Sequence, residues 1–480
     1  MIARHTLRLA RPALAARALS TAPKTAAELD LLEQLLNQAK ARQAAAEAAE
    51  KAEAAAGGPR FQVQTFNAIS PVGLKAFPDK QFLKTGSSGP VPDGVSDEPH
   101  AVLLRSHKLK SEEVASSVRA IARCGAGTNN IPIDEMTKRG IPVFNTPGAN
   151  ANGVKELVIC GMLLASRGIV EGIQHTKEKI VPEEKDHKAI AARIEKDKKH
   201  FVGQELLGKT LAVCGLGNIG AMVAEAGLAL GMNVVGYDPK ISVDAAWRLP
   251  NTVGKLGSLE EAFSLADYVT INMPYIKGVT HHAINAEVLS KMKPTTHILN
   301  CARGEIVDGE ALMRMYDNGH KGKYICDFAD EFMQNHPNFM CIPHLGASTA
   351  EAEDNCAEMA AAQIINYLET GSIKNSVNFP TANLDRQDQA STRLCIVNEN
   401  KPGLLAELTT AIAKGGYNIA QQLNTSRDSI AYNVIDLDGF DESAADTLQK
   451  QLIAIDGVMS TRIIWTGQVQ EGPSNYLTKM

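Results

Sequence analysis

Thr210-Leu-Ala-Val-Cys-Gly-Leu-Gly-Asn-Ile-Gly220 decides the fold, together with the stretch that follows and ends in Asn233-Val-Val-Gly-Tyr-Asp238. Residues 210–214 are a short apolar run typical of a strand, and residues 221–231 carry apolar side chains at helical spacing. The order is therefore strand, glycine turn, helix, strand and acid. This order is typical of a sheet that binds a dinucleotide at the first turn.

Each glycine of the turn has a physical role in such a site. Gly215 permits the tight turn, Gly217 lets the backbone approach a pyrophosphate, and Gly220 allows the helix to pack closely on the strand. The N–H groups at the start of the helix, at Asn218 and Ile219, can donate to the phosphates. We therefore expect these five residues to bind the cofactor.

Asp238 specifies which dinucleotide is expected. At the end of the second strand, its carboxylate can accept hydrogen bonds from both ribose hydroxyls. The same charge would repel a 2′-phosphate, and no arginine follows immediately. The stretch thus favours NAD over NADP; the alternative is a glycine turn in another kind of α/β domain.

Length and composition restrict the other classes. A chain of 480 residues is long enough for two to four domains. A net charge of -5 gives no electrostatic reason to expect nucleic acid or an anionic membrane as a partner, and no apolar run is long enough to span a bilayer. The eight cysteines form no CxxC pair and no Cys/His metal spacing, so we expect a reducing compartment and no metal.

The N-terminus has the composition of a targeting segment. Its early residues include four arginines and no acid before Glu28, with apolar residues at helical spacing. This predicts a transit peptide over residues 1–25, with the mitochondrion as destination and the plastid or cytoplasm as alternatives. A tail with chance arginines is the other interpretation. Residues 26–59 are Ala-rich and predict a helix or linker.

The alternation of strands and helices predicts two parallel α/β domains. Residues 60–157 contain strand-like runs with helical patterns between them, and residues 158–344 contain the dinucleotide stretch and further strands. An Ala-rich helix within residues 345–378 is expected to return to the first domain. We therefore predict a doubly wound Rossmann domain for NAD and a discontinuous, flavodoxin-like substrate domain.

The C-terminal part has a different pattern. Residues 379–391 are polar and predict a linker. Within residues 392–480, runs of strand and helix type follow in a βαββαβ order. This order predicts a separate α+β module of ferredoxin-like fold.

Three ionisable residues, Arg303, Glu331 and His344, each follow a strand-like run of the dinucleotide domain. The runs are residues 297–301, 323–326 and 339–342. Since ligands bind beyond the carboxyl ends of such strands, the three side chains should converge beside the nicotinamide. A guanidinium can hold a carboxylate, an imidazole can take a hydroxyl proton, and a carboxylate can orient the imidazole. The alternative is a surface arginine, a structural histidine and a solvated acidic loop, in which Asp330 competes with Glu331.

With these motifs, residues 60–378 resemble the D-2-hydroxyacid dehydrogenase family. The resemblance rests on Gly215 to Gly220, on Asn300-Cys-Ala-Arg-Gly304 and on Pro343-His-Leu-Gly-Ala-Ser-Thr349. It implies that Arg303 binds the carboxylate, that Glu331 supports His344 and that His344 is the acid/base. It places Cys301 and Asp327 at the cofactor. It also implies a phosphoglycerate pocket, in which both arginines suit the phosphate, formed by Arg105, Ser106, Arg123, Gly127 and Asn150.

The terminal module resembles an ACT domain, a small regulatory fold that binds amino acids. The resemblance implies L-serine as an effector across a dimer interface, with contacts from Asn398, Asn400 and Asn418. A structural oligomerisation module is the alternative. We therefore expect NAD-dependent oxidation of 3-phosphoglycerate to 3-phosphohydroxypyruvate by a homodimer or homotetramer. The alternatives are a reductase for glyoxylate, hydroxypyruvate or 2-oxoglutarate, and a non-catalytic NAD-sensing protein.

Overall fold

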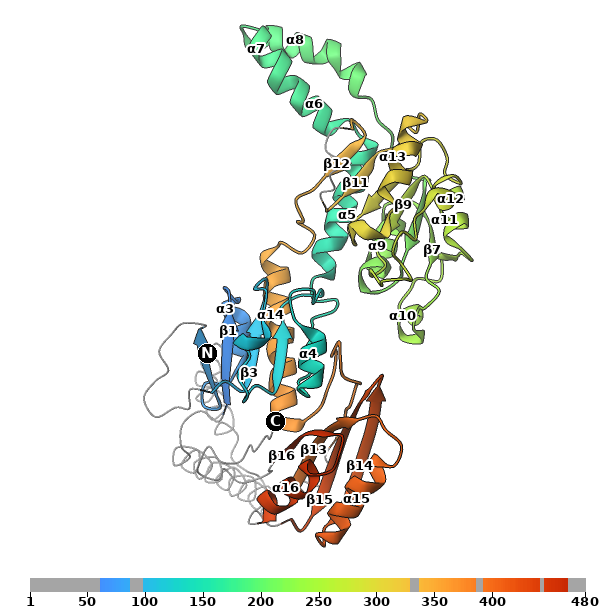
Figure 1. Cartoon of the computed structure of the whole chain (residues 1–480). Coiled ribbons are helices and arrows are strands. Elements are labelled where there is room, and N and C mark those ends of the chain that lie inside the picture. The colour runs from blue at the N-terminus through green and yellow to red at the C-terminus, as the bar shows by residue number, and fades with distance from the viewer. Residues whose placement is uncertain (1–60, 87–97, 329–335, 386–391, 441–443, 465–480) are drawn as a thin grey trace, which may run out of the picture. The chain divides into compact units, whose positions relative to one another are not determined.

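The computed structural model describes residues 61–86, 98–328, 336–385, 392–440 and 444–464. The predicted transit peptide and Ala-rich segment lie outside these residues. The described chain forms three sheets, two of them parallel and one antiparallel (Figure 1). No helix among the described residues has the length and apolar character needed to cross a membrane.

The first sheet is the flavodoxin-like one. All its strands are parallel, and their order is β2-β1-β3-β4-β5, as in a doubly wound sheet of that type. The strands are β1 (Phe61–Phe66), β2 (Phe82–Gly86), β3 (Ala101–Leu104), β4 (Ala120–Arg123) and β5 (Val143–Phe144). The predicted fold class is confirmed here, although β1 and β2 were not predicted as separate strands.

Helices cover this sheet, and one of them comes from far along the chain. The shorter helices are α3 (Pro71–Ala76), η1 (Ser111–Glu113) and α4 (Ile133–Lys138). The distant one is α14 (Ala350–Thr370), which begins at the N-cap Thr349 and ends at Gly371 in the left-handed conformation. Its buried alanines share a core with the strands, and a Cβ at Gly73 of α3 would lie 2.4 Å from the Cβ of Ala357. Small side chains thus let the two helices approach closely.

The second sheet has the Rossmann order. Its strands are parallel, in the order β12-β11-β10-β9-β6-β7-β8. They are β6 (Thr210–Cys214), β7 (Asn233–Tyr237), β8 (Gly254–Lys255), β9 (Tyr268–Ile271), β10 (His297–Asn300), β11 (Tyr324–Cys326) and β12 (Phe339–Cys341). The central strands are buried on both faces, as expected for a sheet between two helical layers.

Each face of this sheet packs against its own helices. One core includes residues of α5 (Ala151–Ser166) and α9 (Asn218–Ala229). The other includes residues of α11 (Leu259–Leu265), α12 (Ala286–Leu289) and α13 (Gly309–Asp317). Two short elements, α10 (Val243–Trp247) and η4 (Gly304–Ile306), lie in the connections.

Between α5 and β6 the chain makes a helical hairpin that extends beyond the seven-stranded sheet (Figure 1). The segment is rich in charged residues, and its elements are helical. Its elements are α6 (Ile169–His175), the π-helix η2 (Thr176–Ile180), α7 (Val181–Glu183), α8 (His187–Asp197) and η3 (Lys198–Phe201).

The third sheet is antiparallel, in the order β14-β15-β13-β16. It is built from β13 (Thr392–Glu399), α15 (Leu404–Lys414), β14 (Asn418–Arg427), β15 (Ile430–Asp438), α16 (Ala445–Ile453) and β16 (Val458–Ile464). The βαββαβ order predicted for this module is the observed one.

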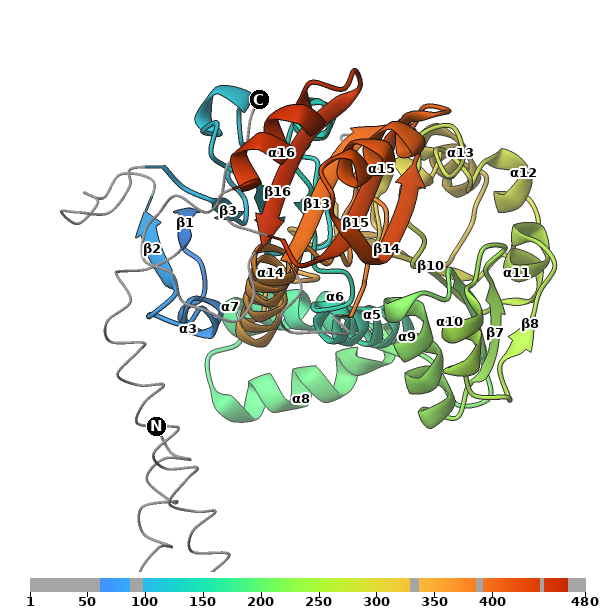
Figure 2. The ribbon, with the colours of Figure 1, turned by 90° about the horizontal axis from the view of Figure 1, so that it is seen from below.

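Side chains of this third sheet bind the C-terminal end of α14, which lies beside β13 and β16 (Figure 2). Arg462 donates to the carbonyl oxygens of Tyr367 and Leu368, at 2.7 and 3.2 Å. Arg393 donates to the carbonyl oxygen of Thr370 at 2.9 Å, and the Tyr432 hydroxyl donates to that of Gly371 at 2.7 Å. Cations at this end also interact favourably with the helix dipole.

The expected linker begins inside the fold rather than on its surface. Phe379 and Ala382 are buried in the same core as α14, and Ala382 forms an antiparallel bridge with Ile373. The polar composition of the segment as a whole led to the linker prediction, although these two side chains are apolar. Residues 379–382 are therefore part of the fold, and residues 386–391 of the predicted linker lie outside the described residues.

Candidate active site

The glycine turn has the geometry that a pyrophosphate site requires. Gly215 has a φ of +94°, and a Cβ there would lie 2.7 Å from the backbone nitrogen of Met273. A Cβ at Gly220 would lie 1.9 Å from the carbonyl oxygen of Gly215, so α9 can pack on β6 only through glycine. A Cβ at Gly217, by contrast, would meet nothing within 4 Å. The room beside Gly217 fits the close approach of a phosphate group.

The start of α9 is arranged for an anion. Gly217 is its N-cap, and no side chain caps the helix. The first turn contains no acid, so the N–H groups near Asn218 and Ile219 are not opposed by negative charge. The Asn218 side chain comes close to Gly148, where a Cβ would lie 2.6 Å from its Nδ2 atom. Asn218 thus lies between the glycine turn and the loop that leads into α5.

Asp238 joins the end of β7 to the glycine turn. Its carboxylate accepts hydrogen bonds from the N–H groups of Leu216 and Lys240, each at 2.9 Å. One bond to each oxygen leaves lone pairs for further donors such as ribose hydroxyls. The sequence predicted the ribose role but not the bond to Leu216, which fixes the shape of the turn.

Arg303 is held by the end of β10. The buried Asn300 side chain donates to the Arg303 carbonyl at 2.8 Å and accepts from the Ala302 N–H at 3.2 Å. Arg303 itself donates to the Ala302 carbonyl through Nη1, at 2.7 Å. Sequence reasoning used Asn300 only as part of a motif, but its side chain orients the loop that carries Arg303.

Phe328 lies between Arg303 and His344. The guanidinium carbon of Arg303 is 5.7 Å from the centre of the Phe328 ring. The Phe328 and His344 rings meet edge to face at 4.8 Å. His344 is exposed and has a φ of +56°, a conformation that non-glycine residues rarely adopt. Arg303 and His344 are therefore near one another, as the sequence suggested, and Phe328 is the contact that it missed.

The loop of His344 is anchored by Asp327. The buried Asp327 carboxylate accepts from the N–H groups of Leu345 and Gly346, each at 2.7 Å. Its expected contact with the cofactor stays a prediction, and these two bonds give Asp327 a role in anchoring the His344 loop. Cys301 is buried, and burial raises the pKa of its thiol to about 12, so it stays protonated at neutral pH.

A second guanidinium comes close to Arg303. A Cβ at Gly127 would lie 3.0 Å from Nη2 of Arg303 and 3.5 Å from Nη1 of Arg123. Burial, with the charge of Arg303, lowers the pKa of Arg123. Arg123 is oriented by the carbonyl of Arg105, to which its Nε donates at 3.1 Å. Two like charges held this close favour an anion between them.

The other predicted substrate residues lie around this pair in different ways. Arg105 forms an ion pair with Glu353 of α14 at 2.5 Å, and Ser106 is exposed. Asn150 is the N-cap of α5, although its side chain makes no capping bond. Glu331 and its rival Asp330 lie outside the described residues, so the partner of His344 stays a prediction.

The predicted effector residues differ in exposure. Asn398 is buried, donates to the Glu399 carbonyl at 2.8 Å and accepts from Asn433 at 2.7 Å. Its amide is therefore committed inside the sheet. Asn400 and Asn418 are exposed, and they donate to the Asp428 carbonyl and the Asp438 carboxylate.

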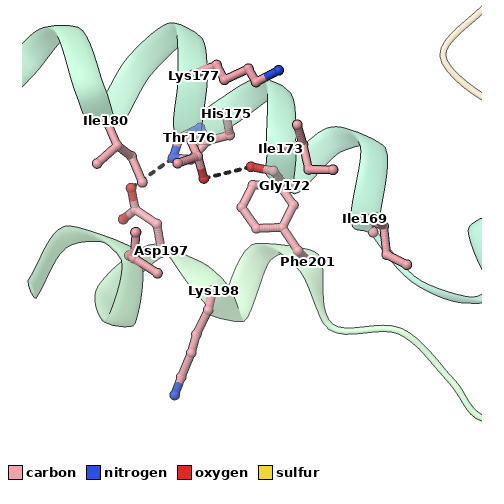
Figure 3. Close-up of a pocket in the computed structure, with 12 residues that line it drawn as sticks. Ile169, Gly172, Ile173, His175, Thr176, Lys177, Ile180, Asp197, Lys198 and Phe201 are labelled. Atoms are coloured by element: carbon pink, nitrogen blue, oxygen red, sulfur yellow. Dashed lines mark hydrogen bonds and ion pairs between the residues drawn. The ribbon is translucent and has the colours of Figure 1, made fainter. Parts of the chain in front are cut away.

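A hollow of about 400 Å³ lies in the helical hairpin, lined by residues between Gly168 and Phe201 (Figure 3). His175 and Asp197 hydrogen-bond across it at 2.9 Å, and Arg193 donates to the same carboxylate at 2.7 Å. These bonds, first that of His175, lower the pKa of Asp197. None of the predicted site residues lines it, so the hollow is distinct from the candidate active site.

Comparison with known proteins agrees with this geometry. Residues 160–346 match the model of the D-isomer specific 2-hydroxyacid dehydrogenase NAD-binding domain. The D-3-phosphoglycerate dehydrogenase of Escherichia coli K12 is 30% identical over 383 residues, which cover 77% of this chain and 87% of that relative. The chain belongs to the D-isomer specific 2-hydroxyacid dehydrogenase family.

Two further relatives differ in how much of their own length this chain covers. The D-3-phosphoglycerate dehydrogenase of Synechocystis is 35% identical, over 62% of this chain and 52% of that relative, so the chain spans about half of it. The NAD⁺-bound 3-phosphoglycerate dehydrogenase of Entamoeba histolytica has a TM-score of 0.50 and 26% identity, over 66% of this chain and 98% of that chain. The family and the glycine turn make the chain an NAD-dependent dehydrogenase.

Proposed function

We propose that this dehydrogenase oxidises 3-phosphoglycerate to 3-phosphohydroxypyruvate, the entry step of serine synthesis. The observation that carries the proposal is the approach of Arg123 and Arg303 at Gly127. The substrate has a carboxylate and a phosphate, and two guanidinium groups from different sheets suit two anionic ends. The names of the relatives in Escherichia coli and Entamoeba histolytica support the same substrate.

The chain's residues divide the work in this reaction. Bound NAD supplies the hydride acceptor. Arg303 holds the carboxylate and polarises the neighbouring C–O bond, and Arg123 holds the phosphate. His344 takes the hydroxyl proton, and Asp327 keeps the His344 loop in place through Leu345 and Gly346. In the reverse direction His344 returns that proton.

NADH absorbance with 3-phosphoglycerate tests the proposal. The His344→Gln variant should lose about 100-fold or more in kcat, since general acid–base catalysis contributes about 10²–10⁴-fold. His187→Gln, an exposed histidine of α8, is the matched control and should keep full turnover. Unchanged turnover in His344→Gln would refute the assigned acid/base role.

A second candidate substrate is a 2-hydroxy or 2-oxo acid without phosphate, such as glyoxylate, hydroxypyruvate or 2-oxoglutarate. The ion pair between Arg105 and Glu353 favours it, because a phosphate at Arg105 would have to displace a carboxylate. A substrate panel with Arg123→Met decides between them. If Arg123 binds the phosphate, Arg123→Met raises KM for 3-phosphoglycerate and leaves KM for the acids without phosphate unchanged. The surface control Arg314→Met should change neither KM.

For the terminal module we propose an ACT-type regulatory role with L-serine as effector. The support is its βαββαβ fold and the exposure of Asn418, which pairs with Asp438 at one end of β15; Asn400 is also exposed but lies at the opposite end of that strand, beside Ser429. Asn418→Ala should abolish inhibition by L-serine and leave uninhibited kcat unchanged. The buried Asn398 is excluded from this test, because its substitution would disturb the sheet.

We also propose a homodimer or homotetramer in which the helical hairpin contacts a second copy. Large apolar side chains are exposed along this hairpin and after it, including Ile173 at 51%, Val202 at 81% and Leu207 at 70%. Apolar exposure of this extent is typical of an interface. Light scattering should give a multimer for the wild type and a smaller species for Ile173→Lys with Val202→Lys.

Finally, we propose that the arginine-rich N-terminus directs the chain to mitochondria. A fusion of residues 1–25 to a fluorescent protein tests this. Mitochondrial fluorescence that is lost when Arg4, Arg8, Arg11 and Arg17 become glutamine is expected. Plastid or cytoplasmic fluorescence would support the alternatives.

A further inference from the structure

Two cysteines face each other on the strands that lead into the active site. Cys326 is the last residue of β11, Cys341 is the last residue of β12, and the two are register partners in a parallel pair. Their sulfur atoms are 3.5 Å apart. None of the roles assigned above uses either thiol.

The geometry allows a disulfide with small movement. Neighbouring strands lie about 4.8 Å apart, and this is within the Cα separation of about 4.4–6.8 Å that disulfides accept. A sulfur–sulfur distance of 3.5 Å is also within the range in which reacting atoms are poised. Within the described residues, β12 is the last strand of its sheet, so it can shift with little cost to other strands.

The two thiols have different environments. Cys341 is exposed, while Cys326 is buried and donates to the Phe328 carbonyl at 3.1 Å. Burial, then the neighbouring Cys341, raises the pKa of Cys326, so this thiol stays protonated at neutral pH. An oxidant from solution therefore reaches Cys341 first, and Cys326 is the resolving partner.

We propose that Cys326 and Cys341 form a reversible disulfide that switches the dehydrogenase off when peroxide is present. The Cys341 sulfur attacks one peroxide oxygen, the O–O bond breaks, and the sulfur becomes a sulfenic acid as one water leaves. The Cys326 sulfur then attacks the Cys341 sulfur, and the displaced hydroxide takes the Cys326 proton and leaves as a second water. Two thiols lose two electrons to one peroxide molecule, and a dithiol reductant reverses the change.

The bond acts on the active site through the ends of both strands. Sulfur–sulfur contraction from 3.5 Å to about 2.05 Å draws β11 and β12 together. The Cys326 S–H also disappears, so the Phe328 carbonyl loses its donor. Since Phe328 contacts both Arg303 and His344, its displacement moves the groups that hold the substrate and take the proton. A displacement of about 1 Å can cost about 100-fold in rate.

The loss of rate rests on the proposed function, but the bond itself does not, so the experiment measures both. The full-length chain is treated with hydrogen peroxide, alkylated and digested without reductant. Trypsin does not separate the two cysteines, since no lysine or arginine lies between Lys323 and Lys374. Cleavage after Glu331 and Glu351 does separate them. Mass spectrometry of that digest then detects a linked peptide pair, and the same sample is assayed with 3-phosphoglycerate and NAD.

The wild type and the control Cys160→Ser, which removes an exposed cysteine of α5, should both form the linked pair. Both should lose about 100-fold in rate and recover with dithiothreitol. Cys326→Ser and Cys341→Ser should fold, form no linked pair, and show no loss that dithiothreitol reverses. Absence of the linked pair in the wild type, or a linked pair with unchanged rate, would overturn the proposal. If the chain forms the linked pair but does not oxidise 3-phosphoglycerate even before peroxide is added, the disulfide stands and the proposed function is refuted.

Discussion

The two glycines at the start of α9 give the sharpest test of how the cofactor site is built. Gly217→Ala and Gly220→Ala add the same methyl group, three residues apart, to one turn. At Gly220 the added carbon would lie 1.9 Å from a backbone oxygen, whereas at Gly217 it would meet nothing within 4 Å. One change should therefore destabilise the domain, and the other should remove cofactor binding alone.

The magnitudes follow from these distances. Overpacking costs about 1–3 kcal/mol, and Gly220→Ala belongs at the upper end because a backbone oxygen cannot turn aside. About 3 kcal/mol corresponds to a fall in Tm of about 6–12 °C for a domain of this size. Gly217 has a φ of -70°, so alanine there is not strained, and its Tm should stay within about 2 °C. Its methyl group, however, occupies the approach of the pyrophosphate, which should raise Kd for NADH by about tenfold or more.

Thermal unfolding by circular dichroism and NADH binding by fluorescence measure these two effects separately. A Gly217→Ala chain that melts as early as Gly220→Ala would contradict the open space assigned beside Gly217. A Gly220→Ala chain as stable as the wild type would contradict the close contact of α9 with β6.

Three further predictions follow from other contacts. Asp238→Ala should raise Kd for NADH by about 10–100-fold and bring it closer to Kd for NADPH, both measured by fluorescence titration. An unchanged ratio of the two Kd values would refute the ribose role. Arg393→Met should cost about 3–5 kcal/mol in urea unfolding, because the buried Asp436 carboxylate loses its charged partner and the Gln421 amide that still donates to it is neutral. The double variant with Asp436→Leu should recover most of the loss, and no recovery would contradict this reasoning. Burial lowers the pKa of His297 to about 4, so at acid pH the unfolded state binds a proton more readily than the folded state does. The free energy of unfolding should therefore fall by about 2 kcal/mol between pH 7 and pH 5. His297→Asn should remove that loss, which melting curves at the two pH values measure.

The fold could be predicted where the periodic pattern was long or punctuated by glycine. The strand, turn and helix around Gly220 are in the predicted places, and so is the order of elements in the third sheet. The strands β1 and β2 were not predicted because polar residues such as Gln62, Gln64 and Lys84 interrupt their apolar residues, so neither forms a continuous apolar run. Helix α5 begins at Ala151, so Asn152 and Gly153 are helical although both residue types are more common in loops.

For the site, the sequence identified residue types at strand ends but not the contacts between them. Arg303, Arg123 and Gly127 come together, as the resemblance implied. The roles of Asn300 and Asp327 as anchors of the Arg303 and His344 loops depend on hydrogen bonds to backbone groups, which leave no mark in a sequence. The chain of asparagines that commits Asn398 inside the third sheet is likewise visible only once the strands are paired.

The attachment of α14 has a consequence for how this chain could be shortened. The helix spans 21 residues, or about 31 Å, and its last carbonyls are satisfied by Arg393, Arg462 and Tyr432. A chain cut after residue 385 would leave those oxygens without their donors and lay bare the apolar surface that the third sheet covers. Removal of the terminal module would therefore destabilise the substrate domain that contains α14, even if the module bound no effector at all.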